Sequence, residues 1–333
     1  MNTNGQPALE AHDLTKTFRT RKEKIEAVRG IDMEIWPGEI FGFLGPNGAG
    51  KTTTLRMLST LLPIESGRAM VSGFDVHKSP HQVRQRIGYV SQLGGSDRLA
   101  TGREDLLLQG ELYGMGRREA ERRADELIEV LDLAEFVSRR VQSYSGGQRR
   151  RLDIALGIMH RPDVLFLDEP TTGLDPQNRA NLWVQISKLR EAGTTIFLTT
   201  HYLEEADALS NRLAIMDHGQ LVAEGTSRQL KQQIAADSVV VSLQEEGTGP
   251  EGAMRLLQEQ DFVREVSAES DHLRLYVDDG VTALPRILRL LDQNGMTIKT
   301  ITLSEPTLDD VFLRYTGRSL RDAGQPPGGK DPQ

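Results

Sequence analysis

The sequence contains no cysteine, and this absence excludes disulfide bonds, thiolate metal sites and a cysteine nucleophile together. Long apolar runs are missing as well. The longest runs, such as residues 164–167 and 194–200, have the length of strands, whereas a membrane-spanning helix needs roughly 20 residues. Residues 1–11 have neither a basic region nor an apolar core, so no secretory signal is expected there. We therefore expect a cytoplasmic chain that does not cross a membrane itself.

Positive charge is also scarce. The 40 lysine and arginine residues are outnumbered by 48 aspartate and glutamate residues, which leaves a net charge of -8. Nucleic-acid-binding surfaces are usually strongly basic, so we expect no nucleic-acid partner. A chain of 333 residues with 38% hydrophobic residues is long enough for one large domain and one small domain.

A glycine-rich segment follows an apolar run at residues 40–44 and precedes a helix-forming stretch. Glycines in this position let successive backbone N–H groups turn inward around phosphates, and the helix start adds partial positive charge. Lys51 is placed to reach the outer phosphates and Thr52 to ligate Mg²⁺ through its hydroxyl. An ordinary glycine-rich turn is the alternative, but the full spacing favours a nucleoside triphosphate site. The predicted nucleotide-binding residues are Gly45, Pro46, Asn47, Gly48, Ala49, Gly50, Lys51, Thr52 and Thr53.

Two carboxylates, Asp168 and Glu169, end the apolar run at residues 164–167. The carboxyl ends of parallel strands converge on the phosphate loop in folds of this kind. Asp168 would hold Mg²⁺ through its water shell, and Glu169 would polarise the attacking water. A polar strand cap is the alternative for such a pair taken alone, and the phosphate loop upstream favours the catalytic interpretation.

The order of apolar and periodic segments predicts an α/β fold. Residues 8–40 suggest a meander of strands, and residues 101–133 have leucines at helical spacing among many charges, which predicts an inserted helical subdomain at about residues 93–154. Further strands are predicted at residues 67–71, 87–91, 164–167, 195–199 and 213–216, with helices at 53–62 and 180–190. The α/β pattern resumes at residues 154–159. Strands this apolar belong in a parallel sheet that is covered on both faces.

After about residue 225 the pattern changes. Strands at 239–243, 263–266, 272–277 and 297–303 alternate with helices at 252–260 and 284–294, and this βαββαβ order suggests a ferredoxin-like unit. A loose helical appendix is the alternative. An amphipathic segment follows at residues 308–315. The predicted domains are residues 1–225, residues 226–317 and a disordered tail at 318–333.

A second anion site is indicated at Ser145, Gly146, Gly147 and Gln148, where small residues with free amides begin another helix. These residues resemble the signature of the ATP-binding cassette (ABC) family, usually Leu-Ser-Gly-Gly-Gln. The resemblance spans about residues 8–225 and implies a P-loop ATPase core with an antiparallel β-subdomain and an inserted helical subdomain, which binds ATP and Mg²⁺. The C-terminal part would be a small α+β accessory domain. In this sequence the signature stands as Tyr144 followed by Ser145, Gly146, Gly147 and Gln148.

The family pattern also implies roles for isolated residues. Phe18 would stack on adenine, although a core strand residue is the alternative. Gln92 would sense Mg²⁺ and the attacking water, and His201 would contact the γ-phosphate. Asp175 would lie in the loop that contacts the second subunit. The implied catalytic residues are therefore Glu169, His201 and Gln92, and the implied metal ligands are Thr52, Gln92 and Asp168.

In this family, the signature of one subunit closes over ATP held by the phosphate loop of another. This chain has one copy of each, so the resemblance implies a homodimer of the cassette subunit. It also implies a separate polytopic membrane subunit whose transport the ATPase powers. The cassette would bind peripherally at the cytoplasmic face of the cell membrane. The helical insertion and residues 94–104 would dock that subunit.

Residues 305–318 look like the ending of ATPases from the daunorubicin/doxorubicin-resistance type of bacterial exporter. This resemblance implies an ATP-hydrolysing subunit that powers efflux of a drug or antibiotic-like compound. Gln148 departs from the methionine expected in many close members. The alternatives are export of a lipid, polysaccharide or peptide, and a soluble ABC ATPase of DNA repair or translation. For residues 308–315, packing on their own domain and contact with a dimer or membrane partner both stay open.

Overall fold

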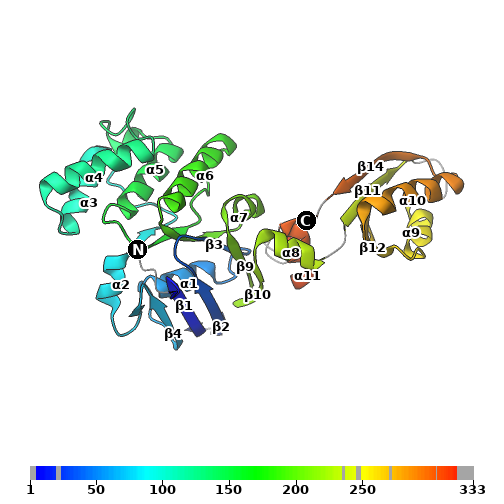
Figure 1. Ribbon diagram of the computed structural model, residues 1–333, viewed down its shortest axis with the longest axis horizontal. Coiled ribbons are helices and arrows are strands. Elements are labelled where there is room, and N and C mark those ends of the chain that lie inside the picture. Colours follow the sequence, from blue (N-terminus) through cyan, green and yellow to red (C-terminus); the bar gives the residue numbers. More distant parts are fainter. Residues whose placement is uncertain are drawn as a thin grey trace, which may run out of the picture. The chain divides into compact units, whose positions relative to one another are not determined.

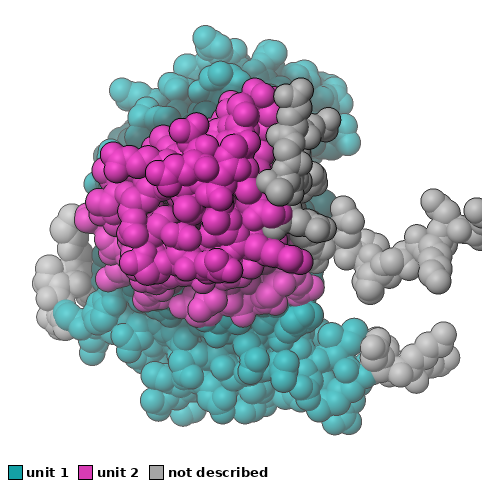
Figure 2. Space-filling view, turned by 90° about the vertical axis from the view of Figure 1, so that its right-hand side faces the viewer, with its two compact units in different colours: residues 1–227, 320–333 teal, residues 228–319 magenta. Residues whose placement is uncertain are grey.

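The computed structural model describes residues 5–19, 24–234, 237–244, 249–269, 272–304 and 306–320. The chain divides into two compact units (Figure 2), residues 1–227 with 320–333 and residues 228–319. The tail that the sequence predicts to be disordered lies outside the described residues from residue 321 onward.

The first unit is built around a six-stranded sheet in the order β10-β9-β3-β8-β7-β6. Strands β3, β9 and β10 of this sheet are labelled in Figure 1. Its strands β3, β6, β7, β8 and β9 run parallel, and β10 pairs antiparallel with β9. Because β8 lies between β3 and β7, residues at the carboxyl ends of these three strands meet at one edge of the sheet. The strands are β3 (Ile40–Leu44), β6 (Ile87–Val90), β7 (Val164–Asp168), β8 (Thr195–Thr200), β9 (Arg212–Asp217) and β10 (Gln220–Gly225).

Side chains alternate between two cores on the two faces of this sheet. On one face, Leu165, Leu167 and Leu198 pack with apolar residues of α5 (Gly146–Gly157) and α6 (Pro176–Glu191). On the other face, Phe166 and Phe197 pack with α1 (Lys51–Leu58) and with the N-terminal strands. Every residue of β3, β7 and β8 is buried, which confirms the predicted parallel sheet covered on both faces.

A second sheet in this unit is antiparallel, in the order β2-β1-β4-β5. It comprises β1 (Leu9–Arg19), β2 (Lys24–Ile35), β4 (Ser66–Val71) and β5 (Phe74–Asp75), and α2 (Pro80–Arg86) follows it. The inserted helices are α3 (Gly102–Leu112) and α4 (Arg117–Val130), followed by the short 3₁₀ turn η1 (Val141–Ser143) before α5. The helix α7 (Leu203–Leu209) follows β8. The predicted fold class is thereby confirmed.

Two element boundaries differ from the sequence prediction. α1 begins at Lys51 and ends at Leu58, whereas the sequence predicted residues 53–62; the left-handed backbone of Thr60, at φ 64°, is incompatible with a continuing helix. Ile154, where the sequence predicted the α/β pattern to resume, lies inside α5, which begins at Gly146 and ends at Gly157.

The second unit contains a four-stranded antiparallel sheet in the order β12-β13-β11-β14. Apolar residues of α9 and α10 form one core with the strands. The βαββαβ order and this strand order are those of a ferredoxin-like fold. The elements are α8 (Ser227–Ile234), β11 (Asp237–Leu243), α9 (Gly249–Gln258), β12 (Val263–Glu269), β13 (His272–Val277), α10 (Gly280–Gln293), β14 (Ile298–Ser304) and α11 (Leu308–Thr316).

Candidate active site

The phosphate loop joins the buried strand β3 to α1. Its last residue, Gly50, has φ 109°, and a Cβ there would lie 2.2 Å from the carbonyl oxygen of Ala27, so only glycine fits. Lys51 is 4% exposed, and its ammonium donates to the carbonyls of Gly45 at 2.7 Å and Pro46 at 3.1 Å. Burial lowers the pKa of Lys51, although the nearby carboxylate of Glu169 acts in the opposite direction. The ammonium is therefore held inside the curve of its own loop.

Asp168, the last residue of β7, lies directly against the start of α1. Its Oδ1 accepts hydrogen bonds from the hydroxyls of Thr52 at 3.0 Å and Thr199 at 2.8 Å. Asp168 is 3% exposed, so these two hydroxyls satisfy a carboxylate that water hardly reaches. The contact joins the first helical turn after the phosphate loop to the ends of β7 and β8.

Glu169 follows Asp168 in a left-handed conformation with φ 46°. Its backbone N–H donates to the carbonyl of Thr199 at 3.1 Å, which ties the residue to the neighbouring strand. A non-glycine residue in this region costs about 1–3 kcal/mol and clusters at functional sites. The backbone therefore turns the Glu169 side chain out of the strand and toward the phosphate loop.

Three of the predicted residues, Lys51, Gln92 and His201, contact the Glu169 carboxylate. Its Oε1 lies 3.5 Å from the Lys51 ammonium and 3.3 Å from Nδ1 of His201, and its Oε2 accepts from Gln92 at 3.1 Å and from the Thr172 hydroxyl at 3.2 Å. Burial acts to raise the pKa of Glu169, but His201 and the Lys51 charge outweigh it, and the pKa lies below its ordinary value. The carboxylate is therefore kept ionised.

Thr172 and Thr199 were not among the residues predicted from the sequence. Thr199 accepts from the backbone of Glu169 and donates to Asp168, so one hydroxyl contacts both carboxylate residues. The only sequence signal for it is its place two residues before His201 at the end of an apolar run. The hydroxyl contacts themselves depend on the pairing of β7 with β8.

The second predicted anion site lies at the start of α5. The hydroxyl of Ser145 accepts from the backbone N–H of Gln148 at 3.2 Å, and the Gln148 side chain accepts from the backbone N–H of Ser145 at 3.1 Å. This reciprocal capping box leaves Ser145 and Gly146 exposed at the helix start. In the described part of the chain, no hydrogen bond joins these residues to the phosphate loop of the same chain. Asp175 caps α6 by accepting from the backbone of Asn178 at 3.0 Å.

Phe18 has no described contact with the cluster around Glu169. It lies in β1 with 39% of its surface exposed, and the Lys16 ammonium is 5.9 Å from the centre of its ring. No described contact joins Phe18 to Lys51 or to Glu169. The structure thus brings together Lys51, Thr52, Gln92, Asp168, Glu169 and His201.

A groove of about 330 Å³ lies beside Gln92, between the sheet and the inserted helices. Tyr89 and Ser91 line it from the end of β6, and Tyr113 lines it from the end of α3. Two exposed leucines follow Gln92 in the chain, Leu93 at 95% and Leu99 at 72% exposed.

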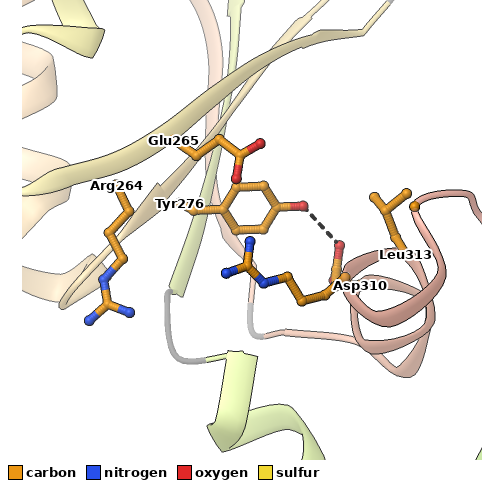
Figure 3. Close-up of a pocket in the computed structure, with 7 residues that line it drawn as sticks. Arg264, Glu265, Tyr276, Asp310 and Leu313 are labelled. Atoms are coloured by element: carbon orange, nitrogen blue, oxygen red, sulfur yellow. Dashed lines mark hydrogen bonds between the residues drawn. The ribbon is translucent and has the colours of Figure 1, made fainter. Parts of the chain in front are cut away.

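A separate cavity of about 430 Å³ lies within the second unit, where β12 and β13 face α11. Figure 3 shows Tyr276 reaching toward Asp310 of α11, with Glu265 and Arg264 on the side of the strands. The Tyr276 hydroxyl donates to Asp310 at 3.3 Å, and burial together with the Asp310 charge raises the pKa of Tyr276 to about 12. Through this contact α11, which belongs to the segment that resembles the exporter ending, packs on its own unit.

A phosphate loop, two adjacent carboxylates on a neighbouring strand and an exposed capped serine on a separate helix together define the class of ATP-binding cassette ATPases. A family model for ABC transporters matches residues 28–172, and a model for the C-terminal domain of DrrA1-3-like ATP-binding proteins matches residues 225–316.

Known proteins are similar to this chain along most of its length. The daunorubicin resistance ATP-binding protein DrrA2 of Streptomyces coeruleorubidus is 42% identical over 93% of this chain and 95% of its own length. The Nod factor export ATP-binding protein I of Burkholderia thailandensis is 38% identical over 89% of this chain and 93% of its own length. The dimeric cassette MJ0796 bound to ADP and Pi superposes with a TM-score of 0.60 at 25% identity, covering 66% of this chain and 98% of that one. The chain belongs to the DrrA-like family of ABC transporter ATP-binding proteins, and it is an ATP-binding ATPase.

Proposed function

We propose that this chain hydrolyses ATP to power efflux of a drug or antibiotic-like compound through a separate membrane subunit. The observation that carries the proposal is the Glu169 carboxylate, which contacts Lys51, Gln92 and His201 at the end of the central sheet. The nearby phosphate loop supplies the place where the triphosphate binds. We propose residues 1–225 as the ATPase domain and residues 226–317 as the accessory domain.

ATP would bind with its phosphates against the backbone N–H groups of the loop and with the Lys51 ammonium at the outer phosphates. Lys51 now donates to two carbonyls of its own loop, and phosphate oxygens are stronger acceptors for these N–H groups. The ring of Phe18 would support the adenine. The full binding set is Gly45, Pro46, Asn47, Gly48, Ala49, Gly50, Lys51, Thr52, Thr53 and Phe18.

The oxygen donors next to the loop fit Mg²⁺. Thr52 and Asp168 supply a hydroxyl and a carboxylate 3.0 Å apart, and Mg²⁺ prefers a few such hard oxygens together with waters and substrate phosphates. The described residues contain no cluster of three or more histidine, aspartate or glutamate ligands, in keeping with a site completed by ATP. Gln92 would add an amide oxygen. When bound, Mg²⁺ neutralises charge on the phosphates.

Glu169 would act as the general base. Its lowered pKa keeps it ionised, and Gln92 and Thr172 hold one of its oxygens while the other faces Lys51 and His201. It would accept a proton from the water that attacks the γ-phosphorus, and the bond to the bridging oxygen of ADP would break. His201, on the next strand end, would contact the γ-phosphate and orient it.

Ser145, Gly146, Gly147 and Gln148 would close over the ATP of a second copy of the chain. Ser145 and Gly146 are exposed at the N-terminus of α5, a helix of twelve residues. Backbone N–H groups and the helix dipole favour phosphate at this position. Asp175, which caps the next helix in sequence, would lie at the same dimer contact. ATP would therefore hold two subunits together, and hydrolysis would release them.

The membrane subunit would dock at the groove beside Gln92. Ser91 and Gly94, on either side of Gln92 and Leu93, line this groove, and Leu93 is exposed. Gln92 itself reaches the general base, so docking and hydrolysis would share one segment. No helix in the described ranges is long and apolar enough to cross a membrane. We propose that the chain acts peripherally, at the cytoplasmic face of the cell membrane.

The relative named for daunorubicin resistance supports a drug as cargo. The relative named for Nod factor export supports a second candidate, an exporter of another cargo such as a lipid, polysaccharide or peptide. The cassette does not touch cargo in either case, so residues of the ATPase site do not distinguish them.

The experiment is affinity purification of the tagged chain from detergent-solubilised membranes of its host, with ATPase activity measured on the co-purified complex. The Glu169→Gln chain is the control for activity that depends on this site. We expect a polytopic membrane protein whose cargo candidates change ATP turnover. Recovery of ribosomes or DNA instead would overturn the proposal.

A further inference from the structure

A buried arginine on α5, the helix that follows the signature residue Ser145, reaches the backbone around the hydrolytic residues. Arg150, in the second turn of α5, is 6% exposed. Its guanidinium donates to three backbone carbonyls: Nε to Pro170 at 2.7 Å, Nη1 to Ser91 at 2.5 Å and Nη2 to Asp168 at 3.0 Å. A buried guanidinium that reaches three carbonyls uses its planar fork, which no other side chain offers.

The three acceptors surround the hydrolytic pair. Asp168 and Pro170 are the residues on either side of Glu169, and Ser91 directly precedes Gln92. One side chain therefore fixes the backbone at both sides of the base and next to the residue that donates to that base at 3.1 Å. This matters because Glu169 has a left-handed backbone, which persists only where the surroundings hold it.

Asp153 acts on the same segment from one turn further along α5. It is 6% exposed, and its Oδ1 accepts from the backbone N–H groups of Gly95 and Ser96, both at 3.0 Å. Arg150 thus holds the start of residues 91–96 and Asp153 holds their end. The helix α5, which Ser145 caps, thus holds both ends of the segment that carries Gln92.

We propose that Arg150 is a positioning residue for hydrolysis, which holds Glu169 against Gln92 and joins the signature helix to the hydrolytic site of its own subunit. The proposal rests on the proposed function, because it takes Glu169 as the general base. It extends that function from the residues that touch ATP to one that acts through them. A purely structural arginine would affect folding and nucleotide binding as much as turnover.

The test compares Arg150→Gln and Arg150→Lys with Arg151→Gln in the full-length chain. Arg151 is the matched control because it lies on the same helix and also donates to a backbone carbonyl, that of Asp132 at 2.9 Å, away from the hydrolytic residues. Steady-state ATP hydrolysis gives kcat and KM, a fluorescent ATP analogue gives nucleotide affinity, and thermal unfolding checks the fold of each variant.

We expect Arg150→Gln to lower kcat about 10²-fold, since misplacing a catalytic group by about 1 Å has effects of this size. Lysine keeps the charge without the fork, so Arg150→Lys should retain more activity, with kcat lowered about 10-fold. Nucleotide affinity and KM should stay within about twofold of the starting chain in both variants, and all values should do so in Arg151→Gln. Should Arg150→Gln fail to fold, Arg150→Lys decides.

A second measurement distinguishes positioning of Glu169 from structural support of the signature residues at Ser145. In a Glu169→Gln background, Arg150→Gln should still form the ATP-dependent dimer in size-exclusion chromatography, because Ser145 and the phosphate loop are untouched. Loss of that dimer, loss of nucleotide affinity in parallel with kcat, or normal kcat in both Arg150 variants would overturn the proposal. If Glu169→Gln by itself keeps normal turnover, the proposed function fails first, and the role of Arg150 fails with it.

Discussion

Replacing Glu169 by glutamine tests the hydrolytic site most directly, because the change removes charge and keeps shape. Glu169 Oε1 faces Lys51 and His201, and Oε2 accepts from Gln92 and Thr172. A glutamine can keep its carbonyl oxygen at Lys51. Its amide nitrogen then faces Gln92, whose own amide can turn to accept, and the Thr172 hydroxyl, which can also accept. The variant should therefore fold with its contacts preserved.

The expected loss is confined to turnover. A positioned general base contributes about 10²–10⁴-fold, which corresponds to about 3–5 kcal/mol of barrier. ATP should bind at least as tightly as before, because the Lys51 ammonium no longer has a carboxylate 3.5 Å away and every loop contact with the phosphates remains. With ATP trapped at both sites, the dimer should persist.

Phosphate release at saturating Mg-ATP, nucleotide affinity and size-exclusion chromatography measure these three quantities. Glu204→Gln is the control, since it removes the same charge from an exposed position three residues after His201. Turnover within about tenfold of the starting chain would refute the assignment of Glu169 as general base. Weakened ATP binding would refute the inference that the negative charge of Glu169 disfavours binding of the triphosphate.

Three further changes test other parts of the chain. Lys51→Ala should weaken ATP binding about 10–100-fold in equilibrium titration, because charge-assisted hydrogen bonds to phosphate are lost; unchanged affinity would contradict the loop assignment. Burial raises the pKa of Glu205 above its ordinary value of 4.5. The folded chain therefore favours the protonated carboxyl of Glu205. The contribution of this carboxyl to the free energy of unfolding is fully present below pH 4.5 and is lost as the pH rises through the raised pKa. Glu205→Gln should therefore gain in melting temperature over the starting chain as the pH rises. A difference that stays constant with pH would show that the pKa of Glu205 is the same in the folded and unfolded chain, and would refute the effect of burial. Asp310→Ala should destabilise α11 by about 2 kcal/mol, seen as faster hydrogen exchange of residues 308–316. Asp310 accepts from the backbone and hydroxyl of Thr307 at 2.8 and 2.7 Å and from Tyr276, and unchanged exchange would exclude this anchoring role.

The phosphate loop could be predicted from the sequence because its chemistry is local. Eight consecutive residues give the turn, the free N–H groups, the lysine and the hydroxyl, and the apolar run before them needs no distant partner to be recognised. The same holds for the capped start at Ser145, where the serine and Gln148 are three residues apart. Short polar elements such as α2, α7 and α8 gave no comparable signal.

The sequence by itself therefore determined which chemical groups the protein has and the kind of fold that carries them. It did not determine which groups meet. Thr52 and Asp168 are 116 residues apart, and they touch because β8 separates β3 from β7 and brings their ends to one edge. Arg150 shows the same limit, since its three acceptors are backbone carbonyls with no side-chain signal in the sequence. Strand order and the burial of a guanidinium are properties of the folded chain, and only the tertiary structure decides them.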